Sequence, residues 1–225
     1  CPMKPEESDQ LTLYSYWRSS AAYRVRIALH LKGLVFKTVP VHLLRQGGEQ
    51  HSEAYRAINP QSLVPALVHE GNVITQSMAI CEYLDECFEP NPLLPSDPLG
   101  RARIRSLVAQ VACDIHPLNN LRVQKYLKGQ CGDAADPVAW MLHWMEEGFE
   151  AIERQLEDRS YNQSGYYGDH PGLFECFLIP QVYSAERYGK DMSAYPVISD
   201  IVSQCRLEPA FIKAAPENQL DKEPV

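Results

Sequence analysis

Two prolines within the segment Glu89-Pro90-Asn91-Pro92 divide this 225-residue chain into parts with different hydrophobic periods. Because proline removes a backbone donor and clashes with the preceding helical turn, a helix that reaches this segment has to end there. Before the segment, stretches in which apolar and polar residues alternate, as in a strand, are interspersed with stretches in which apolar residues have helical spacing. After the segment, only helical spacing recurs. We therefore predict two domains, at residues 1–90 and 91–225.

The first ninety residues predict a small α/β domain. Four segments have strand character, and turn residues bound them: 11–15, 35–42, 65–69 and 72–75. Apolar residues with helical spacing predict three helices: one that begins at a serine cap, Ser20, a short one that ends near Ile58, and one that begins at a second serine cap, Ser77. The order β-α-β-α-β-β-α predicts helices packed on a mixed sheet.

The remainder of the chain predicts an all-helical domain. Three stripes of apolar side chains have helical spacing, within residues 104–115, 138–156 and 173–182. No strand pattern of comparable quality follows Thr75. The last ten residues, 216–225, are polar, and we expect them to form a loose tail.

The charge balance narrows the possible partners. The chain has 21 basic and 29 acidic residues, a net charge of −8, whereas proteins that bind duplex nucleic acid usually have the opposite sign. No run approaches the ~20 apolar residues that span a bilayer. The first ten residues are polar and charged, unlike a signal peptide. We therefore expect neither nucleic acid nor membrane as a partner.

Cysteine usage points to a reducing compartment. Seven cysteines are spread along the chain, an odd number without a Cys-x-x-Cys pair. This pattern disfavours both a disulfide framework and a zinc ribbon, so we expect no metal site. Several of the cysteines lie on apolar helical faces, which favours a cytoplasmic location.

Five segments together carry a specific combination of residues: Ser15-Tyr-Trp-Arg-Ser-Ser-Ala-Ala-Tyr-Arg-Val-Arg-Ile-Ala-Leu29, Asn59-Pro-Gln-Ser-Leu-Val-Pro-Ala-Leu67, Gln76-Ser77, Ile115-His-Pro-Leu-Asn-Asn-Leu-Arg122 and Pro180-Gln-Val-Tyr-Ser-Ala-Glu-Arg187. The combination closely resembles the zeta class of glutathione transferases, whose bacterial members are maleylacetoacetate and maleylpyruvate isomerases. The resemblance extends from about residue 11 to about residue 216. It implies a thioredoxin-like N-terminal domain, a helical C-terminal domain, glutathione as cosubstrate and a homodimer.

By this resemblance, Ser19 lies beside the glutathione sulfur, with Ser20 as the second candidate. Both serines stand where the first strand meets the first helix. A hydroxyl there can donate to a sulfur anion, and a helix N-terminus favours negative charge. The alternative for Ser20 is a plain helix cap.

Further residues are implied to hold the rest of glutathione. Val64-Pro65 resembles the Val-cis-Pro step of thioredoxin-like folds, which turns the Val64 backbone toward the cysteinyl part of the ligand. Gln76 and Ser77 are implied to bind the γ-glutamyl carboxylate, the alternative for Ser77 being a plain helix cap. Gln50 matches a position that contacts the glycyl end, and is otherwise a surface glutamine.

The resemblance also implies a substrate with two carboxylates. Arg18, Arg122 and Arg187 match family positions, and the guanidinium fork suits bidentate carboxylate binding. An ion pair with a nearby carboxylate is the alternative for Arg187. We expect Arg24 and Arg26 to face outward or to pair locally, although the position of Arg24 lies near the site in the family.

His116 precedes Pro117 inside a long predicted helix, which the proline should kink. By resemblance, His116 orients glutathione or substrate, and Asn120 is similarly placed one turn on. A hydrogen-bonded histidine packed at a kink is the alternative.

The implied activity is glutathione-dependent cis-trans isomerisation of maleylacetoacetate to fumarylacetoacetate, in aromatic amino acid catabolism. The thiolate adds reversibly to the cis double bond, the resulting single bond rotates, and elimination leaves the trans isomer. Maleylpyruvate isomerase and a general transferase of this class remain alternatives. A non-catalytic glutathione-binding module is a third alternative, which the matching serines and arginines disfavour.

The chain departs from the family pattern at two places. Ala21 stands where relatives usually have cysteine, which excludes a redox role for a thiol at this helix start. Gly172 and Glu175 replace the hydroxyl residue and the aspartate of a capping box. Because glycine has no side-chain acceptor, we expect a weaker helix start, rescued by Asp169 or by water.

Overall fold

The computed structural model describes residues 10–157 and 165–223; residue Cys1 and the rest of 1–9, together with 158–164 and 224–225, lie outside the described part. The chain divides into two compact units. The first unit comprises Cys1–Leu93 and Glu208–Val225, and the second comprises Leu94–Leu207.

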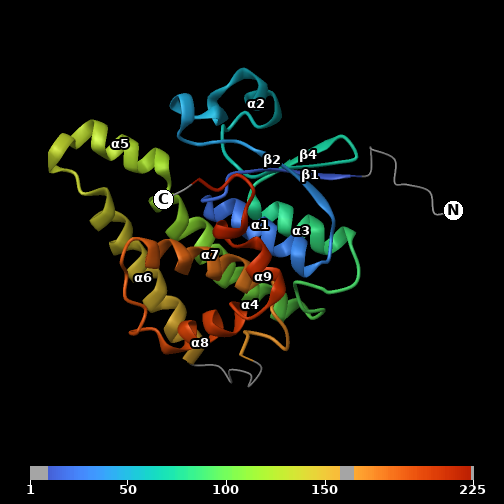
Figure 1. Cartoon of the computed structure of the whole chain (residues 1–225). Coiled ribbons are helices and arrows are strands. Elements are labelled where there is room, and N and C mark those ends of the chain that lie inside the picture. The colour runs from blue at the N-terminus through green and yellow to red at the C-terminus, as the bar shows by residue number, and fades with distance from the viewer. Residues whose placement is uncertain (1–9, 158–164, 224–225) are drawn as a thin grey trace. The chain divides into compact units, whose positions relative to one another are not determined.

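The first unit is built on a four-stranded mixed sheet in the order β2-β1-β3-β4 (Figure 1). The strands are β1 (Leu11–Ser15), β2 (Phe36–Pro40), β3 (Ala66–His69) and β4 (Asn72–Thr75). β1 is parallel to β2 and antiparallel to β3, and β3 forms a hairpin with β4. This is the predicted order of elements.

Helices cover both faces of this sheet. α1 (Ser20–Leu31) and α3 (Ser77–Cys87) pack against each other on one face, and α2 (Glu53–Ile58) lies on the other (Figure 1). Alternation along β1 explains the two layers, because Leu11 and Leu13 are buried, whereas the ring of Tyr14 contacts that of Tyr55 in α2.

The C-terminal segment returns to the first unit, where α9 (Pro209–Ala214) packs on α1. The sequence predicts that all of residues 91–225 belong to the helical domain and that residues 216–225 form a loose tail. Instead, a short 3-10 helix (Pro216–Asn218) follows, and the carboxylate of Asp221 accepts a hydrogen bond from the backbone N–H of Trp17. These contacts connect residues about two hundred positions apart, which local patterns do not reveal.

The second unit contains helices and no strand in its described residues, as predicted. Its helices are α4 (Pro98–Ala109), α5 (Leu121–Cys131), α6 (Pro137–Glu157), α7 (Leu173–Arg187) and α8 (Pro196–Cys205). α7 is the central helix, since residues 173–182 are all buried and it packs against α4 and α8. Across the described residues, no helix is both long and apolar enough to cross a membrane.

The long helix predicted around Pro117 is interrupted rather than merely kinked. α4 passes into a π-helical segment, Gln110–Ile115, and then into a 3-10 turn, His116–Asn119, before α5 begins. Because Pro117 has no backbone N–H to donate, it accounts for the break in the ladder of helical hydrogen bonds. The π-helical segment begins seven residues before this proline, at Gln110.

The start of α7 is capped by Glu175. The carboxylate of this buried residue accepts hydrogen bonds from the backbone N–H groups of Gly172 and Tyr167, each at 2.8 Å. The rescue expected from Asp169 or water is therefore supplied by the third residue of the helix itself. Burial raises the pKa of Glu175, and the two backbone donors oppose that rise.

Candidate active site

The junction of β1 and α1 places Ser19, rather than Ser20, at the helix cap. Ser19 has extended backbone angles (φ −69°, ψ 117°), and its Oγ accepts a hydrogen bond from the N–H of Ala22 at 3.2 Å. Ser20 is the first helical residue. Because a hydroxyl that accepts the capping bond still has its own hydrogen to donate, Ser19 can cap the helix and bind an anion together.

Arg18 lies directly before this cap, half-buried against Trp17. Its guanidinium carbon is 4.3 Å from the centre of the Trp17 ring, and Trp17 is only 3% exposed. Stacking of a guanidinium on an indole is attractive and directional. The aromatic ring therefore fixes the direction of the cation beside Ser19.

Gln76 and Ser77 form the start of α3. Gln76 has left-handed backbone angles (φ 70°, ψ 117°) and occupies the cap position, while Ser77 is the first helical residue and is buried. The predicted cap at Ser77 is therefore displaced by one residue. The side-chain amide of Gln76 donates to Oε1 of Gln61 at 2.7 Å. A non-glycine residue in this conformation is strained and is often found at functional sites.

Arg24 and Arg26 are buried in α1, at 2% and 0% exposure, so the prediction that they face outward was wrong. Nη1 of Arg24 donates to Oγ of Ser77 at 3.2 Å. Residues 22–29 of α1 are all buried, and both α3 and α9 pack on this helix. The signal in the sequence was that this stretch has no polar face.

The Val64–Pro65 peptide bond is cis. The ladder between β1 and β3 ends at the pair Tyr14 and Ala66, so Val64 lies outside the sheet. The cis peptide bond is the one that the resemblance to thioredoxin-like folds implied.

Gln50 is buried at 6% exposure and is not the surface glutamine of the alternative reading. It lies in the 3-10 helix Glu49–His51, and its Nε2 is 3.2 Å from Nε2 of His51. Gly48 makes room for it: with φ +113°, a Cβ at this position would lie 2.5 Å from Nε2 of Gln50. Within the described residues, Oε1 of Gln50 has no hydrogen-bond partner.

The loop that carries Gln50 is held by charged contacts. Nδ1 of His42 accepts from the backbone N–H groups of Leu44 and Arg45, so the remaining ring hydrogen lies on Nε2, 3.2 Å from Glu223. Arg45 also donates to Glu223, through Nε at 2.9 Å. Hydrogen bonds from Arg45 first, and then from His42, lower the pKa of Glu223.

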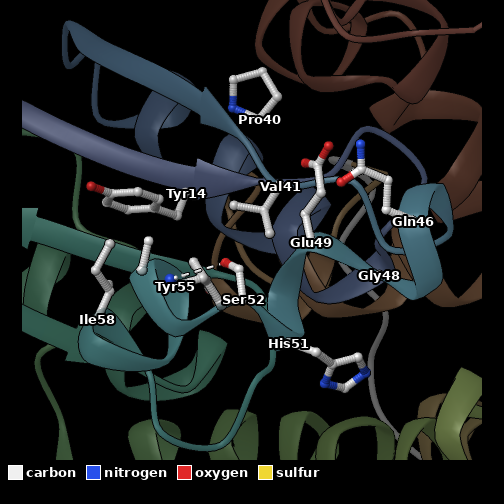
Figure 2. Close-up of a pocket in the computed structure, with 11 residues that line it drawn as sticks. Tyr14, Pro40, Val41, Gln46, Gly48, Glu49, His51, Ser52, Tyr55 and Ile58 are labelled. Carbon is white, nitrogen blue, oxygen red and sulfur yellow. Dashed lines mark hydrogen bonds between the residues drawn. The ribbon is translucent and has the colours of Figure 1, made fainter.

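A separate hollow of about 650 Å³ lies between Tyr14, Pro40 and Val41 on one side and the segment containing α2 on the other (Figure 2). Glu49 and His51, the neighbours of Gln50, belong to its lining. None of the residues assigned to glutathione lines this hollow, so the starts of α1 and α3 form a different surface.

In the second unit, His116 and Asn120 flank the 3-10 turn before α5. His116 is half-buried and opens the turn. Asn120 caps α5, since its Oδ1 accepts from the N–H of Arg122 at 3.1 Å. The side-chain oxygen of Asn120 is therefore occupied by the helix cap, whereas its side-chain nitrogen remains able to donate a hydrogen bond to a ligand.

Arg122 and Arg187 are exposed on separate helices of the second unit. Arg122 is the second residue of α5. Arg187 ends α7, where its Nη2 donates to the hydroxyl of Tyr188 at 2.9 Å and its guanidinium carbon lies 4.6 Å from that ring. The neighbouring carboxylate, Glu186, pairs instead with Arg206. The alternative of an ion pair between Arg187 and this neighbouring carboxylate is therefore wrong, because Arg206 makes that pair.

Comparison with known proteins gives consistent matches. Residues 9–86 match the family model of the glutathione S-transferase N-terminal domain. Over 212 residues, the chain is 46% identical to the maleylacetoacetate isomerase of Pseudomonas aeruginosa, and the match covers 94% of this chain and 98% of that protein.

Two solved structures extend this similarity. One is the holo structure of maleyl pyruvate isomerase, a bacterial zeta-class glutathione S-transferase: the TM-score is 0.90 and the identity 42%, over 94% of this chain and 100% of that one. The other is maleylacetoacetate isomerase from Anaeromyxobacter dehalogenans with glutathione bound in the active site: the TM-score is 0.82 and the identity 38%, over 94% of this chain and 97% of that one.

Proposed function

Because this chain belongs to the zeta-class glutathione transferase family, we propose that it is a glutathione-dependent isomerase that converts maleylacetoacetate to fumarylacetoacetate. The observation that carries the proposal is the cap of α1, where the Ser19 hydroxyl and a helix N-terminus follow directly on Arg18. Such a start suits a sulfur anion next to a carboxylated substrate. The reaction belongs to aromatic amino acid catabolism.

Ser19 stabilises the reactive sulfur in this proposal. Its hydroxyl donates to the thiolate while its oxygen keeps the capping bond from Ala22. The positive end of the α1 dipole adds to this effect, so that the pKa of a thiol at this position falls below its ordinary value of about 8.5. Ser20, one residue further into the helix, is the second donor.

The other residues of the first unit bind the remaining parts of glutathione. Gln76 and Ser77 bind the γ-glutamyl carboxylate at the start of α3, and Arg24 adds positive charge behind Ser77. Val64 pairs through its backbone with the cysteinyl part, and Gln50 contacts the glycyl end. From the second unit, His116 and Asn120 orient the bound ligand.

Arg18, Arg122 and Arg187 bind the two carboxylates of the substrate. When bound, glutathione supplies a thiolate that adds to the cis double bond, permits rotation of the resulting single bond, and leaves by elimination to give the trans isomer. During the addition, negative charge moves to the carbonyl oxygen next to the double bond. The fixed cations and N–H groups stabilise this charge without reorganising.

Glutathione is neither oxidised nor consumed in this reaction, since the proton and the sulfur that add to the double bond are both lost again in the elimination. Ala21, in place of a cysteine, leaves no protein thiol at this helix start to form a mixed disulfide. We further propose that the enzyme is a cytoplasmic homodimer, as the family resemblance implies.

The decisive experiment measures cis-to-trans conversion of maleylacetoacetate and of maleylpyruvate with and without catalytic glutathione. We expect turnover only with glutathione, and faster turnover of maleylacetoacetate. Preference for maleylpyruvate would instead favour the alternative isomerase. Activity undiminished without glutathione, or glutathione binding without turnover of either diacid, would contradict the proposal.

Matched variants test the assigned roles. Ser19→Ala should lower kcat by roughly 10²-fold because one donor to the anion is lost, and should raise the pKa of the bound thiol. Ser20→Ala should have a smaller effect on both quantities, because Ser20 is not the cap. Arg122→Ala should raise KM for the diacid and leave glutathione affinity unchanged.

A further inference from the structure

The C-terminal segment of the first unit, residues 208–223, reaches the loop between β1 and α1. Oδ2 of Asp221 accepts a hydrogen bond from the backbone N–H of Trp17 at 3.0 Å. This bond joins residues 204 positions apart and is partly buried. A carboxylate that accepts from a backbone N–H makes a charge-assisted bond, which is stronger than a bond between neutral groups.

Arg26 holds the other side of the same residue. Its Nη2 donates to the carbonyl oxygen of Trp17 at 3.0 Å, and its Nε donates to the carbonyl oxygen of Ala214, the last residue of α9, at 2.9 Å. Its Nη1 donates to Oγ of Ser15 at 3.1 Å, which secures the end of β1. Both main-chain polar groups of Trp17 are thus bonded, one to the C-terminal segment directly and the other through Arg26.

The hydrogen bonds of Asp221 and Arg26 hold the main chain of Trp17, and Arg18 packs on the indole ring of this residue. Trp17 is almost fully buried, and the guanidinium carbon of Arg18 lies 4.3 Å from the centre of its ring. The next residue, Ser19, donates its N–H to the carbonyl oxygen of Tyr16 at 2.9 Å. A shift of the Trp17 main chain would therefore move the Arg18 cation first.

We propose that Trp17 is a positioning residue for Arg18, and that Asp221 and Arg26 together hold Trp17, so that the C-terminal segment sets the affinity for the diacid substrate. The inference rests on the proposed function, in which Arg18 binds a substrate carboxylate. A carboxylate bound by a guanidinium needs accurate direction, because both N–H bonds of the fork have to align.

The first experiment compares Asp221→Ala, Asp221→Asn and Lys222→Gln. Asp221→Ala should raise KM for the diacid about tenfold, in line with loss of one charge-assisted bond, while kcat and the Kd of glutathione stay near wild type. Asp221→Asn keeps an oxygen acceptor and should restore most of the affinity. Lys222→Gln is the matched control, since it changes one charge at an exposed neighbouring position and should leave every parameter unchanged.

A second measurement separates positioning from general destabilisation. Arg18→Ala and the double variant Arg18→Ala/Asp221→Ala are compared for binding of succinate, an unreactive diacid, by calorimetry with glutathione present. If Asp221 acts through Arg18, its replacement has no further effect on the Kd of succinate once Arg18 is gone. Additive losses, or equal losses of diacid and glutathione affinity in Asp221→Ala, would overturn the proposal.

The two proposals fail separately. If the wild-type protein binds glutathione and succinate but turns over no maleyl diacid, the proposed function fails, while the effect of Asp221 on succinate binding still decides the inference. If the wild-type protein isomerises the diacid and Asp221→Ala leaves KM unchanged, the inference alone is wrong.

Discussion

The guanidinium of Arg24 in α1 donates a hydrogen bond to the hydroxyl of Ser77, the first residue of α3, at 3.2 Å. The arginine is 2% exposed, so this contact holds a cation directly behind a helix N-terminus. Because the Ser77 oxygen accepts from Arg24, its own hydrogen is directed toward another acceptor. Cation, hydroxyl and helix dipole together make this helix start suitable for a carboxylate.

Replacement of Arg24 tests this arrangement. Arg24→Gln should weaken glutathione binding by about tenfold, since a charge-assisted interaction is replaced by a neutral one. Arg24→Lys retains the charge and should have an intermediate effect. Calorimetric titration with glutathione measures the Kd, and thermal unfolding shows that both variants remain folded. Unchanged affinity in Arg24→Gln would mean that the arginine serves only to join α1 and α3.

The fold was predictable because its signals are local. Alternation along β1, the hairpin of β3 and β4, and the prolines after α3 are each contained in a few residues. The return of α9 to α1 was not predictable in the same way. It depends on contacts such as that between Arg26 and Ala214, which are 188 positions apart and leave no periodic pattern.

The candidate site was predictable by position but not in its geometry. The strand-to-helix junctions located Ser19 and Ser77, yet which residue caps each helix depends on backbone angles at Ser19 and Gln76. Burial of Gln50 depends on the turn at Gly48, and burial of Arg24 depends on elements distant in sequence that pack on α1. None of these follows from residue type alone, since arginine and glutamine are usually exposed.

A pair of glycines offers a matched test of the Gln50 position. Gly47 and Gly48 both have positive φ, so alanine strains the backbone at either position. A Cβ at Gly48 would lie 2.5 Å from Nε2 of Gln50, whereas nothing lies within 4 Å of one at Gly47. Gly48→Ala should therefore displace the Gln50 side chain and weaken glutathione binding several-fold more than Gly47→Ala.

Thermal unfolding provides the control for this pair. Both variants should lose about 1 kcal/mol of stability from backbone strain, and Gly48→Ala should lose more because it also displaces a buried side chain. If both variants remain folded at the temperature of the titration, a weaker glutathione Kd in Gly48→Ala reflects the displaced Gln50 side chain rather than unfolding of the loop. Equal affinities in the two variants would remove Gln50 from the binding site.

Glu175 predicts a pH dependence of stability. Burial raises its pKa in the folded protein, so the folded state binds this proton more readily than the unfolded state. The contribution of a carboxyl with a raised pKa is fully present below its unfolded pKa and is lost as the pH rises through its folded pKa. The stability advantage of the wild type over Glu175→Gln should therefore be largest at the acid end and should narrow toward neutral pH.

Urea unfolding of both proteins at a series of pH values measures this difference, and all other groups titrate alike in the two chains. If the stability advantage of the wild type over Glu175→Gln instead grew with pH, the pKa of Glu175 would be lowered on folding rather than raised. In that case the bonds from Gly172 and Tyr167 would outweigh burial and hold the pKa of Glu175 low.

Gly148 in α6 tests whether the π-helical segment positions His116. A Cβ at Gly148 would lie 2.2 Å from Cδ1 of Ile115, a fully buried residue that ends this segment and directly precedes His116. Because Ile115 cannot move into solvent, Gly148→Ala should cost about 1–3 kcal/mol by overpacking and should weaken glutathione binding through a shift of His116. Gly129→Ala in α5 is the control, since a Cβ there meets nothing within 4 Å and should stabilise the exposed helix by about 0.5–1 kcal/mol. Chemical unfolding and calorimetry separate the two effects: a destabilised Gly148→Ala variant with wild-type glutathione affinity would show that the π-helical segment does not act on glutathione binding through His116.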